Sequence, residues 1–145
     1  MLEITSPWDL KTIDKIKYDS EKEIENYLQI AKKVSLKKGL DFLPKERLVV
    51  LNKFSEKIKN NIQELAKLAS LEGGKPMLDS LVEIRRGADG VDSCIEVLKN
   101  ESGSVIPMNI DDASENRIAF TQKEPIGVVL AISAFNHPFN LIIHQ

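Results

Sequence analysis

The residues best suited to chemistry form one short segment near the end of the sequence, residues 132–138 (ISAFNHP). This segment follows a continuous apolar run, residues 126–132, which is typical of a strand covered on both faces in a parallel sheet. In open α/β sheets, ligands bind outside the carboxyl ends of such strands. Asn136 offers two N–H donors that do not ionise, so it could hold an oxyanion that develops on a carbonyl carbon. The alternative is that Asn136 caps the helix that Pro138 begins, which is a preferred role of asparagine.

Other reactive side chains do not form convincing sites. Cys94, the single cysteine, falls on the inward face of a predicted helix beside acidic residues, and both conditions raise the pKa of a thiol. We therefore predict that Cys94 is a small core residue. Residues 73–75 (GGK) lack the first glycine and the hydroxyl of a phosphate loop, so they are interpreted as a helix end. His137 and His144 are about 10 Å apart along a helix, too far to share one zinc ion, and no metal site is expected.

Two extended segments and one helix must position Asn136. Residues 117–124 alternate apolar and polar side chains, as a half-exposed strand does, and residues 126–133 form the apolar run. Pro138 then begins a helix that reaches the last residue of the sequence. A parallel strand requires a crossover helix and a second strand, and neither is complete here. We therefore interpret the chain as part of a larger α/β domain.

Apolar spacing predicts four helices before these strands. The first begins at a Ser20–Glu23 capping box, runs to about Lys38 and is capped by Gly39, with one apolar face expected to be buried. The second begins at Pro44, the third covers about residues 61–73, and the fourth covers about residues 78–98. Gly87 and Gly90 weaken the fourth helix by about 1 kcal/mol each relative to alanine, so close packing against a neighbour is expected there.

Charge and composition exclude several classes of protein. The 20 basic and 22 acidic side chains give a formal charge of -2, which provides no broad basic field for nucleic acid or an anionic membrane. No apolar run approaches the roughly 20 residues that span a bilayer, and the first residues lack the pattern of a signal peptide. We therefore expect a cytoplasmic protein with neither nucleic acid nor membrane as a partner.

Residues 123–141 (KEPIGVVLAISAFNHPFNL) resemble the aldehyde dehydrogenase segment that leads through an EPxGVV motif into the first strand of the NAD-binding domain. Residues 46–47, 65–66 and 72–76 resemble the family's helix ending in GGKP, and residues 116–120 resemble the strand before EPxGVV. The likeness runs in order from about Thr5 to Gln145. Many members have proline, tryptophan and an aromatic residue where this chain has Ala134, Phe135 and His137, which hints at a subgroup acting on small polar aldehydes.

The resemblance implies an α/β fold of N-terminal helices followed by the first strand-turn-helix of a Rossmann-type NAD-binding domain, incomplete in this chain. Residues 1–145 would form this N-terminal part, with a strand near 117–124 similar to the family's oligomerisation arm. Asn136 would stabilise the oxyanion of a thiohemiacetal. The backbone at Ile132, Ser133 and Phe135 would line the nicotinamide-side ribose of NAD or NADP.

The implied activity is oxidation of a small aldehyde to a carboxylate or thioester by a homo-oligomer. The nucleophilic cysteine, the general-base glutamate and the ribose-binding lysine lie further along in that family and cannot be assigned here. The isolated chain is therefore expected to be inactive. The alternative is a non-catalytic helical interaction module, which would be a stable monomer or simple dimer.

Overall fold

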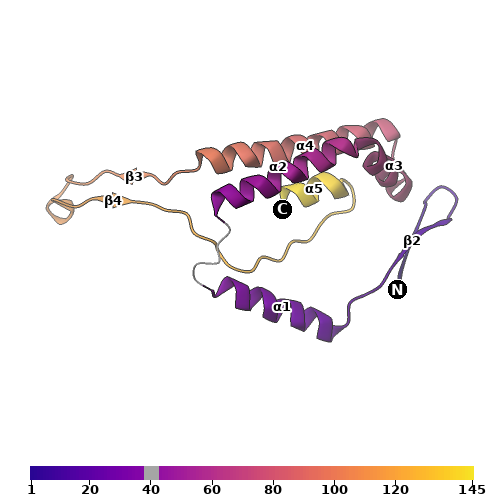
Figure 1. Cartoon of the computed structure of the whole chain (residues 1–145), viewed down its shortest axis with the longest axis horizontal. Helices are drawn as coiled ribbons and strands as arrows, with labels where there is room; N and C mark the ends of the chain where they lie inside the picture. The colour runs from indigo at the N-terminus through magenta and orange to yellow at the C-terminus, as the bar shows by residue number, and fades with distance from the viewer. Residues whose placement is uncertain (38–42) are drawn as a thin grey trace.

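The computed structural model describes residues 1–37 and 43–145. Four helices gather into a bundle, while a hairpin, a separate helix and a two-stranded ribbon project from it (Figure 1). The helices are α1 (Glu21–Ser35), α2 (Pro44–Asn60), α3 (Ile62–Gly73), α4 (Met77–Asn100) and α5 (Pro138–His144). The strands are β1 (Leu2–Thr5), β2 (Thr12–Ile16), β3 (Val105–Ile106) and β4 (Ala119–Phe120), and a 3-10 turn, η1, covers Asp112–Ser114.

The core lies along α4, against which α2, α3 and α5 all pack. Its inward positions recur three or four residues apart, the spacing of one face of a helix. The buried apolar residues are Ile58, Ala66, Ile84, Ala88, Val91 and Ile95. Phe139 and Ile143 bring α5 onto this cluster. The structure therefore confirms the predicted second, third and fourth helices and the helix that begins at Pro138.

The predicted start of the first helix and the predicted end of the third are also confirmed. The Ser20 hydroxyl accepts from the Glu23 N–H at 3.3 Å, and the Glu23 carboxylate accepts from the Ser20 N–H at 2.7 Å, which completes the capping box. Gly74 ends α3 in the left-handed region, at φ 65°, where glycine carries no steric penalty. The first helix ends at Ser35, with Leu36 as its C-cap, so the predicted end at about Lys38 with Gly39 as the cap is wrong; Lys38 and Gly39 themselves lie outside the described residues.

The two helical glycines of α4 allow α5 to approach closely, as the sequence predicts. A Cβ added at Gly87 would lie 2.6 Å from Cε1 of Phe139, and one at Gly90 would lie 3.3 Å from Cγ2 of Ile143. The absence of side chains at these positions thus lets an aromatic ring and a branched aliphatic chain rest on the α4 backbone.

The predicted strands are mostly wrong. Residues 126–133 form no strand, and every residue from 121 to 137 is exposed. The half-exposed strand at 117–124 shortens to β4, which pairs antiparallel with β3 through Val105–Phe120 and Ile106–Ala119. A strand persists only where a neighbour satisfies its backbone N–H and C=O groups, and the described residues offer none to the apolar run. The N-terminal hairpin of β1 and β2, in contrast, was not predicted.

The expectation of a buried face on α1 is also wrong for this structure. No residue of α1 is buried, and its apolar stripe, including Tyr27, Leu28 and Val34, is about half exposed. Figure 1 shows α1 standing apart from the bundle. Within the described part of the chain, no helix is both long enough and apolar enough to cross a membrane.

Candidate functional site

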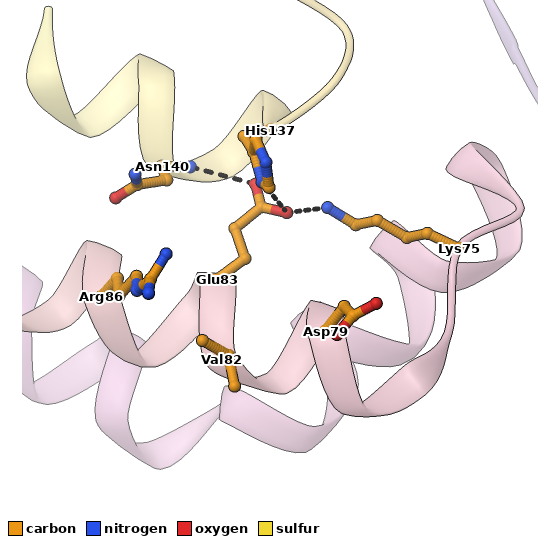
Figure 2. A pocket seen from close by; sticks show the side chains of 7 residues that line it. All are labelled: Lys75, Asp79, Val82, Glu83, Arg86, His137 and Asn140. Atoms are coloured by element: carbon orange, nitrogen blue, oxygen red, sulfur yellow. Dashed lines mark hydrogen bonds and ion pairs between the residues drawn. The ribbon is translucent and has the colours of Figure 1, made fainter.

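A buried carboxylate, Glu83 of α4, lies beneath the start of α5 (Figure 2). Its Oε1 accepts from the backbone N–H of Phe139 at 2.9 Å and of Asn140 at 3.2 Å. Its Oε2 pairs with the ammonium group of Lys75, from the loop between α3 and α4, and lies 3.7 Å from Nδ1 of His137. The Glu83 side chain is only 1% exposed, so these partners take the place of water.

The pKa of Glu83 lies below its ordinary value. Burial by itself would raise that pKa, but the hydrogen bond from Lys75, the Asn140 N–H, the charge of Lys75 and the Phe139 N–H together outweigh it. Glu83 is therefore ionised at neutral pH. It satisfies two backbone donors that the first turn of α5 would leave unpaired, and it places negative charge where the helix dipole favours it.

The turn before α5 is consequently held by Glu83 and not by Asn136. His137 occupies the N-cap position of α5, and its side chain makes no capping hydrogen bond. Asn136 precedes it, with an exposed side chain that hydrogen-bonds to none of the described residues. The alternative interpretation of Asn136 as the helix cap is therefore wrong.

The three residues predicted to contact a cofactor lie on the outer side of this turn. Ile132, Ser133 and Phe135 are all exposed, and Phe135 is 92% exposed. The carbonyl of Ile132 accepts from the side-chain amide of Gln145, and the Ser133 hydroxyl lies 3.4 Å from the carbonyl oxygens of Ala134 and Pro138. The structure thus gathers the predicted residues at one exposed turn.

A pocket of about 340 Å³ adjoins the turn, and His137 belongs to both. Its lining is drawn in Figure 2 and consists of Lys75, Asp79, Val82, Glu83, Arg86, His137 and Asn140. Sequence reasoning did not find Lys75, Glu83 or Arg86 as site residues. The sequence did contain one signal for Glu83. This residue stands next to inward-facing Ile84 and about one turn before Gly87, so it falls on the inward side of the helix, and a charged side chain on that side needs a buried partner.

Cys94 is exposed on α4, so the prediction that it is a small core residue is wrong. Val91 and Ile95 take the inward positions of this part of the helix. Cys94 directly precedes Ile95 and is therefore turned about 100° away from that face.

Comparison with known proteins extends the resemblance over the whole chain. Residues 1–145 match the aldehyde dehydrogenase family. Lactaldehyde dehydrogenase of Methanocaldococcus jannaschii is 32% identical over 145 residues, covering 99% of this chain and 30% of that enzyme. The 3-sulfolactaldehyde dehydrogenase of Priestia aryabhattai is 38% identical over 104 residues, covering 72% of this chain and 22% of that enzyme.

A solved structure shows the same arrangement of the backbone. Glyceraldehyde-3-phosphate dehydrogenase GapN of Methanocaldococcus jannaschii, in complex with NADP, superimposes with a TM-score of 0.86 and 31% identity. The match covers 99% of this chain and 30% of that one, so the chain spans about a third of the length of its relatives. This likeness confirms the predicted α/β fold class, and the chain belongs to the aldehyde dehydrogenase family.

Proposed function

We propose that this chain provides the oxyanion-binding turn and part of the cofactor site of an NAD(P)-dependent aldehyde dehydrogenase. The single observation that carries the proposal is the free amide of Asn136 on a turn that Glu83 holds from below. An amide that neither caps the helix nor pairs internally can donate to an oxyanion without first breaking a bond of its own. Glu83 is a positioning residue, because it fixes the first turn of α5 and touches no reacting atom.

The exposed surface of the turn fits a dinucleotide cofactor. Phe135 and Ile132 present apolar surface, and the exposed residue Ser133 lies between them in the sequence. The related GapN structure was determined with NADP, which supports NAD or NADP as the cofactor here. When bound, the cofactor supplies the acceptor for hydride. The residues of this chain orient it and exclude water from one side.

The substrate proposed is a small polar aldehyde, oxidised to a carboxylate or thioester. The named substrates of the two relatives support this class, since one is a lactaldehyde dehydrogenase and the other a 3-sulfolactaldehyde dehydrogenase. The pocket beside His137 is at the small end of the range for ligand pockets, which agrees with a substrate of few atoms.

The β3–β4 ribbon is proposed to mediate assembly. It contains part of the segment near 117–124 that resembles the family's oligomerisation arm. Val105 and Phe120 pair across the ribbon, and both are mostly exposed. Such exposure is expected of apolar side chains that contact a second copy of the chain in an oligomer. We propose a cytoplasmic homo-oligomer on this basis and on the composition of the chain.

The test is a hybrid enzyme in which residues 1–145 replace the matching third of the Methanocaldococcus jannaschii lactaldehyde dehydrogenase. Asn136→Ala should lower kcat by about 10²–10³-fold, as loss of one oxyanion donor does elsewhere. Asn100→Ala is the matched control, because the amide of Asn100 bonds only within its own helix, to the Glu96 carbonyl. Unchanged turnover in the Asn136 variant of an active hybrid would refute the catalytic role.

The isolated chain is proposed to be inactive, because Cys94 is its single cysteine and lies on α4 instead of in the turn. Purified chain, free of host enzymes, should therefore form no NADH or NADPH from an added aldehyde. Cofactor reduction that follows the chain through purification would contradict this part of the proposal.

A further inference from the structure

Charge is separated along the length of the pocket beside the turn. Asp79 and Arg86 are seven residues apart on α4, which places their backbones about 10 Å apart along the helix axis. Figure 2 shows Asp79 on the Lys75 side of the pocket and Arg86 on the Asn140 side. Glu83, between them, is already balanced by Lys75 and by two backbone N–H groups. The Arg86 end of the pocket is therefore its positive end.

Arg86 has no hydrogen bond or ion pair with any of the described residues, and it is exposed to solvent. Its guanidinium group presents five N–H donors in a planar fork, a geometry that matches the oxygens of a carboxylate, sulfonate or phosphate. Arg86 also directly precedes Gly87, where Phe139 rests on the α4 backbone. The guanidinium group therefore lies beside the close contact between α4 and α5. This contact fixes the position of the two helices that line the pocket.

We propose that this pocket binds the anionic end of a small aldehyde substrate, with Arg86 as the principal donor and His137 as a second donor. His137 lines the pocket and directly follows Asn136, so a ligand held by Arg86 would extend toward the turn that carries the oxyanion donor. The ligand class is an aldehyde of few carbon atoms that carries a sulfonate, phosphate or carboxylate. This inference rests on the proposed function, and it names the part of the substrate that the described residues recognise.

Arg85 provides a matched comparison for a charge on the same helix. It is also exposed, but it lines a different hollow, together with Lys59, Asn61 and Glu64, away from α5. A general attraction between anions and a basic helix surface would depend equally on both arginines. A specific pocket would depend on Arg86 alone.

The experiment measures how anions stabilise the 145-residue chain against urea, followed by far-UV circular dichroism at low protein concentration. Methanesulfonate, inorganic phosphate and acetate are compared at equal ionic strength with chloride. A ligand that binds only the folded state raises the free energy of unfolding by RT ln(1 + L/Kd), where L is the ligand concentration, so the dependence on anion concentration gives its dissociation constant. Arg86→Gln should weaken binding about tenfold or more, whereas Arg85→Gln should leave it unchanged.

Stabilisation by any of the three anions that follows this dependence and is weakened by Arg86→Gln supports the pocket, and the anion that binds most tightly identifies the group recognised. Equal effects of the two glutamine variants, or no stabilisation of the unaltered chain beyond that in chloride, would overturn the proposal. If Arg86→Gln does not fold, Arg86→Lys is measured in its place. Lysine keeps the positive charge but lacks the planar set of N–H donors, so the anion should bind more weakly to this variant.

This result is independent of aldehyde oxidation by the hybrid enzyme. A hybrid without activity would count against the proposed function while the anion measurement still decided the role of Arg86. An active hybrid adds a second readout, because Arg86→Gln should raise KM for 3-sulfolactaldehyde by a much larger factor than KM for uncharged propanal. An equal rise for both aldehydes would contradict recognition of the anionic end.

Discussion

Two polar side chains stand less than one turn apart on the buried side of α4 and differ in how they are satisfied. Glu83 has four partners, counting His137, whereas the hydroxyl of Ser80 is fully buried and hydrogen-bonds to none of the described residues. A buried polar group without a partner costs about 1–3 kcal/mol. The same helix face therefore contains one well-compensated charge and one uncompensated hydroxyl.

Ser80→Ala should be neutral or should stabilise the chain by up to about 1 kcal/mol, because the methyl group keeps the packing and removes the unpaired hydroxyl. Ser55→Ala is the matched control, since the Ser55 hydroxyl is equally buried but donates to Asp92 at 2.6 Å. That control should lose about 1–2 kcal/mol. Urea unfolding of the two variants measures both effects, and a comparable loss at Ser80 would mean that its hydroxyl has a partner.

Glu83→Gln should destabilise the chain by about 2 kcal/mol at neutral pH, because the ion pair with Lys75 is lost while the volume is kept. The pKa of Glu83 is lowered in the folded state, so its contribution is fully present above about pH 4.5 and falls as pH drops through the folded-state pKa. The difference in unfolding free energy between the two proteins should therefore be constant from about pH 7 to about pH 5 and shrink below that.

Urea titrations across this range test the sign of the effect. The other carboxyls with lowered pKa values, such as Asp92 and Asp111, titrate in both proteins and cancel in the difference. A difference that stays constant down to about pH 3 would show that folding does not lower the pKa of Glu83.

Sequence reasoning locates the turn but not the group that holds it. Asn136 stands out in the sequence because a carboxamide directly after an apolar run is placed where α/β sheets bind ligands. Glu83 is 53 residues away from Asn136 in the sequence, and only the docking of α5 on α4 brings its carboxylate beneath residues 139 and 140. Such a contact depends on tertiary packing, which apolar spacing does not encode.

At the scale of elements, helices were predicted better than strands for a physical reason. A helix closes its backbone hydrogen bonds within itself, so the apolar spacing of α4 and the glycine that ends α3 suffice to define them. A strand depends on a neighbour. Residues 126–133 have the composition of a buried strand and remain irregular here, because the described residues provide no strand beside them.

Gly87→Ala should destabilise the chain by about 1–2 kcal/mol. The added Cβ would meet the Phe139 ring at 2.6 Å, and the cost of overpacking exceeds the gain of about 1 kcal/mol in helix propensity. Gly90→Ala should be neutral or slightly stabilising, since the nearest atom, Cγ2 of Ile143, lies at 3.3 Å and need move by only a few tenths of an ångström.

Hydrogen exchange of the α5 amides separates the two glycine variants, because displacement of α5 should raise exchange throughout that helix in the Gly87 variant alone. Equal protection of α5 in both variants would indicate that the Phe139 ring moves aside without disturbing the helix.

For the molecule as a whole, the packed bundle accounts for only part of the apolar surface. The apolar stripe on α1 and the apolar run at residues 126–132 are both exposed. In the apolar run, Ile126 is 91% exposed and Leu130 is 83% exposed. Apolar segments of this kind favour association, particularly where unpaired backbone groups can also form strands with another chain.

We expect the 145-residue chain to associate between about 1 and 100 µM, with larger species appearing as concentration rises in sedimentation velocity. Leu130→Lys should shift this association to higher concentration, because it places a charge in the middle of the exposed run. Ile110→Lys is the control, since Ile110 is similarly exposed but stands alone in a polar loop. A monomer at every concentration would instead favour the helical interaction module, because that alternative requires a chain whose exposed apolar residues do not drive self-association.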